Sequence, residues 1–65
     1  MTYKEKKFLD YVDKKVEYCL QTGINKKYIA EKLDDVINNL PENTSSELFN
    51  ILYRIQDNLL FGNEF

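Results

Sequence analysis

The chain has 65 residues and therefore forms one domain at most, and a domain this small buries only about 60% of the surface of its unfolded chain. Nine Lys and Arg residues against eleven Asp and Glu residues give a net charge of −2, which is too mild to mark a nucleic-acid binder by itself. A single cysteine excludes a disulfide within the chain, and without histidine a zinc site would have to use Cys19 and carboxylates alone. We therefore expect no metal and no cofactor, and oligomerisation is the remaining way to stabilise so small a domain.

The first helix is predicted over about residues 2–22. Thr2 and Glu5 have the T-x-x-E spacing of a capping box, and Gly23 is a natural left-handed stop on which Ile24 can pack back. At about 100° per residue, its apolar side chains fall in one arc: Phe8, Leu9, Val12, Val16, Cys19 and Leu20.

The second helix is predicted over about residues 25–40, with Asn25 as its cap and Pro41 ending it, because the residue before proline disfavours helix. Its apolar arc consists of Ile29, Ala30, Leu33, Val36, Ile37 and Leu40.

The third helix is predicted over about residues 44–61. Thr44 and Glu47 form a second T-x-x-E box, and Gly62 ends the helix. Its core arc consists of Leu48, Ile51, Leu52, Ile55 and Leu59. Three amphipathic helices with short connections predict an all-α fold, a small antiparallel three-helix bundle that forms one domain over residues 1–65.

A second apolar stripe lies beside the core arc of the third helix. It consists of Phe49, Tyr53 and Leu60, and Phe61 lies away from both arcs. A helix that touches two neighbours needs a wide apolar face, so the stripe is either part of the bundle or a surface for a dimer or another partner. We expect a homodimer through this stripe, since two-fold dimers are the commonest oligomers.

The first helix carries a second candidate surface, in which lysines alternate with tyrosines on one arc: Lys4, Lys7, Tyr11, Lys14, Lys15 and Tyr18. Such side chains can contact phosphates or an acidic protein surface. The alternative is that the tyrosines cover the edge of the bundle and the lysines are solvated.

Catalysis finds little support in the sequence. No histidine is present for general-base work at neutral pH, and Cys19 lies on the apolar arc, where it should be buried and inert. The chain also lacks a glycine-rich phosphate loop. We expect no catalytic residues and no enzymatic activity.

The stretch "EKLDDVINNL", residues 31–40, is faintly similar to the second helix of the small helical-hairpin phosphatases that dephosphorylate sporulation regulators. That family carries a Ser-Gln-Glu-Leu-Asp motif. The corresponding run here is Ala30, Glu31, Lys32, Leu33 and Asp34, so only the Leu-Asp pair matches. The resemblance would imply that Asp34 matters for phosphate release.

The function predicted from the sequence is a small non-catalytic protein-binding module, a bacterial or phage regulator, inhibitor or adaptor that docks by a helix on a larger protein. The alternatives are a nucleic-acid-associated accessory protein that uses the Lys/Tyr arc, and the helical phosphatase. No stretch approaches the ~20 apolar residues of a membrane span and no signal peptide is evident, so we expect a cytoplasmic protein without membrane contact.

Overall fold

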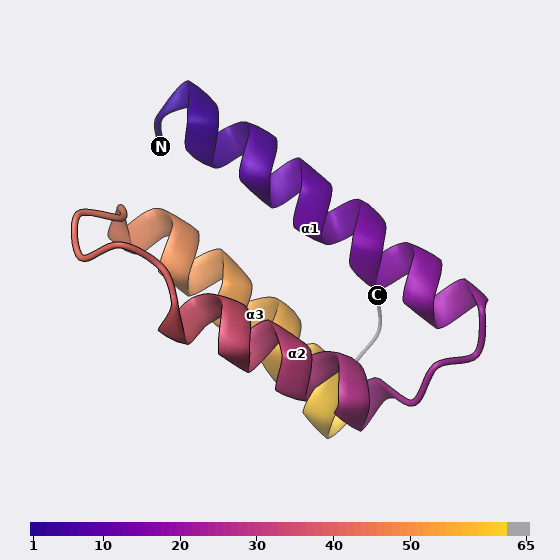
Figure 1. Ribbon diagram of the computed structural model, residues 1–65. Helices are drawn as coiled ribbons and strands as arrows, with labels where there is room; N and C mark the ends of the chain where they lie inside the picture. Colours follow the sequence, from indigo (N-terminus) through magenta and orange to yellow (C-terminus); the bar gives the residue numbers. More distant parts are fainter. Residues whose placement is uncertain (63–65) are drawn as a thin grey trace.

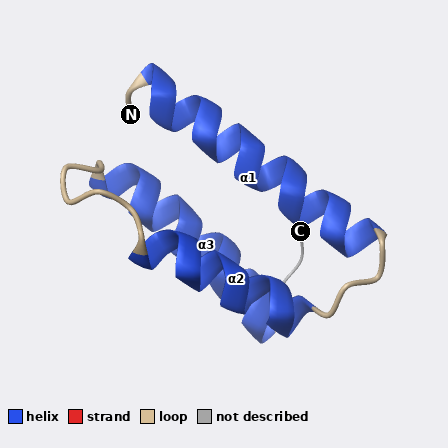
Figure 2. Ribbon diagram, in the orientation of Figure 1, coloured by secondary structure: helices blue, strands red, loops and turns tan. Residues whose placement is uncertain are grey.

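The computed structural model describes residues 1–62, which form three helices: α1 (Tyr3–Gln21), α2 (Lys26–Asn38) and α3 (Ser46–Phe61). The helices run up, down and up, so that α1 and α3 begin at one end and α3 finishes near the α1–α2 turn (Figure 1). The bundle measures 33 × 19 × 18 Å, and its long dimension is close to the length of α1, about 28 Å at 1.5 Å per residue. Figure 2 shows helices and loops only over residues 1–62, which confirms the expected all-α three-helix bundle.

Both expected ends of α1 are confirmed. The Thr2 hydroxyl accepts the N–H of Glu5 at 3.2 Å, and the Glu5 carboxylate accepts the N–H of Thr2 at 2.9 Å, which completes the capping box. Gly23 has a φ of 81°, and the Ile24 amide donates to the Cys19 carbonyl at 3.0 Å in the pattern of a Schellman motif.

The second helix begins as expected and ends earlier. Asn25 caps it, since its side-chain oxygen accepts the N–H of the second helical residue at 2.8 Å. The helix ends at Asn38 rather than at residue 40, because Asn39 leaves the helical conformation and its side-chain amide donates to the Asp35 carbonyl at 2.8 Å. Pro41 therefore lies beyond the end of the helix and does not set it.

The capping box expected at the start of α3 is wrong. The helix begins at Ser46 with Ser45 as its N-cap, and no side chain of the cap accepts a helical N–H. Glu47 therefore stands one position too early in the helix for the reciprocal bond that the Thr44 spacing predicted.

A carboxylate from α1 accepts the bond that an N3 glutamate would accept in a local capping box of α3. Glu5 Oε2 accepts the N–H of Ser45 at 2.9 Å, while Oε1 of the same group holds Thr2. One side chain thus binds the starting residues of α1 and α3. The hydrogen bonds from Ser45 and then Thr2 lower the pKa of Glu5 below its usual 4.5, because they favour the ionised form.

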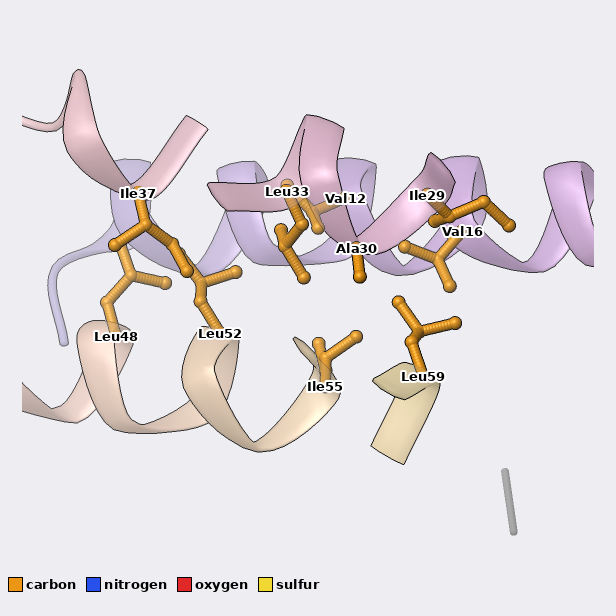
Figure 3. Packing of buried hydrophobic residues seen from close by; sticks show 10 residues of the cluster. All are labelled: Val12, Val16, Ile29, Ala30, Leu33, Ile37, Leu48, Leu52, Ile55 and Leu59. Atoms are coloured by element: carbon orange, nitrogen blue, oxygen red, sulfur yellow. The ribbon is translucent and has the colours of Figure 1, made fainter. Parts of the chain in front are cut away.

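The core lies along the axis between the three helices, and α2 and α3 form its most closely packed pair. Figure 3 shows ten buried side chains meeting there: Val12, Val16, Ile29, Ala30, Leu33, Ile37, Leu48, Leu52, Ile55 and Leu59. Within residues 1–62 no helix is long and apolar enough to cross a bilayer.

The first helix packs less deeply than its arc predicted. Only two of the six predicted side chains of α1 are buried, and the other four are half-buried against the cluster: Phe8, Leu9, Cys19 and Leu20. Three predicted core residues on the other helices are also half-buried: Val36, Leu40 and Ile51. The shallow seat of α1 leaves a groove along its border with α2.

Candidate protein-binding groove between α1 and α2

The groove has an apolar floor built from both helices. It encloses about 250 Å³ and is open to solvent along the seam between α1 and α2. Six of the side chains that line it are apolar or weakly polar: Val12, Val16, Cys19, Ile29, Leu33 and Val36. Among the described residues, no carboxylate lines it.

Each rim of the groove carries a tyrosine with a lysine placed over its ring. The Lys15 ammonium lies 5.7 Å from the centre of the Tyr11 ring on α1, and the Lys32 ammonium lies 5.4 Å from the Tyr28 ring on α2. All four side chains line the groove. The two rings are 59% and 52% exposed, so each presents a large aromatic surface at the groove edge.

The local sequence explains this geometry. Both pairs have the spacing Tyr-x-x-x-Lys, and residues four apart are neighbours on a helix surface. A cation over an exposed aromatic ring is stabilised by about 0.5–1 kcal/mol. That is smaller than the ~2 kcal/mol of rotamer entropy in a lysine side chain, so the contact biases the flexible chain toward the ring without fixing it.

The two rim lysines have no carboxylate partner among the described residues. Within residues 1–62 the ion pairs are Lys14 with Asp10 at 3.1 Å and the Met1 ammonium with Glu47 at 3.6 Å. Lys15 and Lys32 take part in neither pair. The groove therefore combines an apolar floor with two positive charges that no carboxylate of residues 1–62 neutralises.

The other side of α2 has the opposite charge. A shallow depression between α2 and α3 is lined by Glu31, Asp34 and Asp35, together with Ala30, Gln56 and Leu60. The side-chain amide of Gln56 donates to the Ala30 carbonyl and to Asp34, both at 3.3 Å. Hence α2 separates a positively rimmed groove from a negatively charged one.

A further charge cluster lies on α1 outside the groove. Partial removal from water raises the pKa of the Asp13 carboxyl, and the charges of Asp10 and Glu17 on the neighbouring turns raise it further. Among residues 1–62, no group of three or more His, Cys, Asp or Glu side chains is arranged to hold a metal ion.

The six residues of the predicted Lys/Tyr arc are distributed over several environments. Tyr11 and Lys15 line the groove, and Lys4 lines a second depression at the end of the bundle, near Phe8. The others lie outside the groove: Lys7 rests 5.0 Å from the Tyr3 ring, Lys14 pairs with Asp10, and Tyr18 is 63% exposed.

The four residues predicted to form an interface on the third helix differ in their exposure to solvent. Phe49 is half-buried and packs against the core. Tyr53 and Leu60 are each 47% exposed, and Phe61 is 75% exposed. Phe49 thus belongs mainly to the bundle, while the other three present apolar surface to solvent.

Sequence reasoning missed Tyr28 and Lys32. They lie outside the apolar arc of the second helix, although this helix repeats the Tyr-x-x-x-Lys spacing of Tyr11 and Lys15. That repeat was visible in the sequence. The groove itself was not, because its depth depends on how far α1 stands from the core.

A scan against protein-family models found no match, and neither the curated proteins nor the solved structures contain a similar protein.

Proposed function

We propose that this protein is a small non-catalytic protein-binding module, a regulator, inhibitor or adaptor that acts on a larger protein by binding one of its helices in the α1–α2 groove. The observation that carries the proposal is the apolar seam of about 250 Å³ between two antiparallel helices. Amphipathic helices bind in such grooves through apolar anchors at positions i, i+3, i+4 and i+7.

We also propose that the protein comes from a bacterium or a phage and acts in the cytoplasm. The nucleic-acid alternative has less support, because the groove floor is apolar and α2 carries a carboxylate face beside it. Phosphate binding would require a continuous basic surface, whereas Lys14 on the same arc is already paired with Asp10.

The helix 3 surface supports a second protein contact. Tyr53 and Leu60 lie seven residues apart on one face of α3 and are both exposed, Phe61 adds an exposed ring at the end of the helix, and exposed apolar surface of this kind marks interaction sites. We assign this surface to a homodimer of the module, which leaves the α1–α2 groove free for the partner.

The test is affinity selection from a displayed library of 16-residue amphipathic helices on the immobilised protein. Val36→Gln places a polar side chain in the groove, and Ile51→Gln is the matched control, since Ile51 is also half-buried and does not line the groove. Circular dichroism first verifies that both variants fold. Selected peptides should bind Val36→Gln at least tenfold more weakly and Ile51→Gln with little change.

Two results would contradict the proposal. One is a selection that enriches no peptide. The other is a set of peptides that bind Val36→Gln as tightly as the wild type. Tight binding of an oligonucleotide that weakens steeply as salt rises would instead favour the nucleic-acid function.

A further inference from the structure

We infer that the helix received by the α1–α2 groove carries carboxylates on both flanks of its apolar stripe, staggered by about half a helical turn. The inference rests on the proposed function and specifies the chemistry of the partner. It follows from the size of the groove, the two rim lysines and the antiparallel direction of the helices.

The size of the groove favours side chains of a helix over a small molecule. Pockets for small molecules commonly enclose about 300–1,000 Å³ and bury most of the ligand. The groove encloses about 250 Å³ and stays open along its length. A helix lying on it would insert a few apolar side chains and keep its polar face in solvent.

The positive charges on the two rims favour a partner helix with negative charges on both flanks of its apolar stripe. Lys15 and Lys32 have no carboxylate partner within residues 1–62, and the groove lining contains no acidic side chain. The rings of Tyr11 and Tyr28 already hold the two ammonium groups near the groove, so less side-chain freedom is lost when a carboxylate binds. A carboxylate placed at either rim would meet an unneutralised cation.

The stagger follows from helix direction. On α1, Lys15 is nearer than Tyr11 to the α1–α2 turn, whereas on α2 it is Tyr28 that is nearer to that turn than Lys32. Figure 3 places Val12 level with Leu33 and Val16 level with Ile29. Lys15 lies between Val12 and Val16, and Lys32 lies between Ile29 and Leu33, so the two lysines are offset along the groove by about two residues or about 3 Å.

The opposite side of α2 makes the groove selective. A helix with acidic flanks would meet Glu31, Asp34 and Asp35 if it lay on the depression between α2 and α3. Like charges facing each other across an interface are strongly unfavourable. The same ligand is thus attracted to one side of α2 and repelled by the other.

The experiment uses the displayed helix library with Glu, Lys and Gln allowed at every flanking position. Selection on the wild-type protein should enrich Glu on both flanks, about two residues apart along the peptide. The best peptide is then synthesised, and its Kd is measured for Lys15→Glu, Lys32→Glu and the control Lys7→Glu. Lys7 is matched because it also lies over a tyrosine four residues earlier, outside the groove.

Charge reversal at Lys15 or Lys32 should raise the Kd about tenfold or more at low salt, with a smaller effect at high salt. Lys7→Glu should change it little, and a Lys-flanked copy of the peptide should recover binding to the doubly reversed protein. Binders that depend on the groove but show no preference for Glu would overturn this inference and leave the proposed function standing. Equal losses for Lys7→Glu and Lys15→Glu would also overturn it, and a selection without binders would contradict both.

Discussion

Replacing Leu52 by Ala should destabilise the protein far more than the same change at Leu60. Leu52 is 0% exposed at the centre of the core, whereas Leu60 is 47% exposed on the same helix. Removing three buried carbons from Leu52 costs about 2.4 kcal/mol in transfer free energy, and the cavity raises the total to about 3–5 kcal/mol. The half-exposed Leu60 loses about half of that transfer term and leaves no cavity, so about 1 kcal/mol is expected.

The loss at Leu52 is large compared with the whole molecule. A domain of this length has a free energy of unfolding of about 3–10 kcal/mol. Urea denaturation followed by circular dichroism at 222 nm measures the effect, and with a slope of about 1 kcal/mol per molar the Leu52→Ala midpoint should fall by about 3 M or more, or the chain should be unfolded in buffer. Measured well below micromolar concentration, where the proposed dimer through Leu60 is dissociated, Leu60→Ala should shift the midpoint by about 1 M. Equal shifts would show that α3 is rotated about its axis, with its second stripe toward the core.

The remaining predictions concern charge, thiol reactivity and association. The lowered pKa of Glu5 contributes stability above pH 4.5 that is lost as the pH falls through the pKa of the folded state, so urea midpoints of Glu5→Gln should depend less on acid than those of the wild type; parallel curves for the two proteins would contradict this. The raised pKa of Asp13 has the opposite sign, and Asp13→Asn should be more stable than the wild type at neutral pH, with a gain that shrinks as the pH falls toward 3.8; no gain at pH 7 would refute it. Cys19 is half-buried at the groove and should react with a thiol reagent more slowly than in denaturant, and more slowly still when a groove peptide is bound; labelling at the denatured rate would mean that α1 is detached. The homodimer should be visible by light scattering at ~100 μM, where micromolar dimers are mostly assembled, and Tyr53→Gln with Leu60→Gln should halve the mass; a wild-type monomer at that concentration removes the dimer.

The helices could be predicted from the sequence because most of their capping interactions join residues that are close in the sequence. Thr2 and Glu5 bond to each other, and the amides of Gly23 and Ile24 donate to carbonyls at most five residues earlier, so local spacing carries the information. The start of α3 could not be predicted in this way, since its capping partner is Glu5, forty residues earlier. The spacing of Thr44 and Glu47 matches a local capping box. The bond actually formed at this helix start is a tertiary one, which no local pattern reveals.

The groove could not be predicted from the sequence either, because it depends on how the helices pack. Helical periodicity predicts which side chains face the core, and it did so correctly for Val12 and Val16. It does not predict how far a helix stands from its neighbours. Cys19 shares their arc and was expected to be buried, yet it is half-buried because that border of α1 is not filled by α2.

The carboxylate of Glu5 has a consequence for the motions of the native protein. Its two oxygens hold the amides of Thr2 and Ser45, which are far apart in the sequence, so the starts of α1 and α3 share one anchor. If α1 frays from its start, Ser45 loses its acceptor at the same moment, although no peptide bond near it has moved. Hydrogen exchange should therefore report the amides of Thr2 and Ser45 as opening together, while the middle of α3 remains closed.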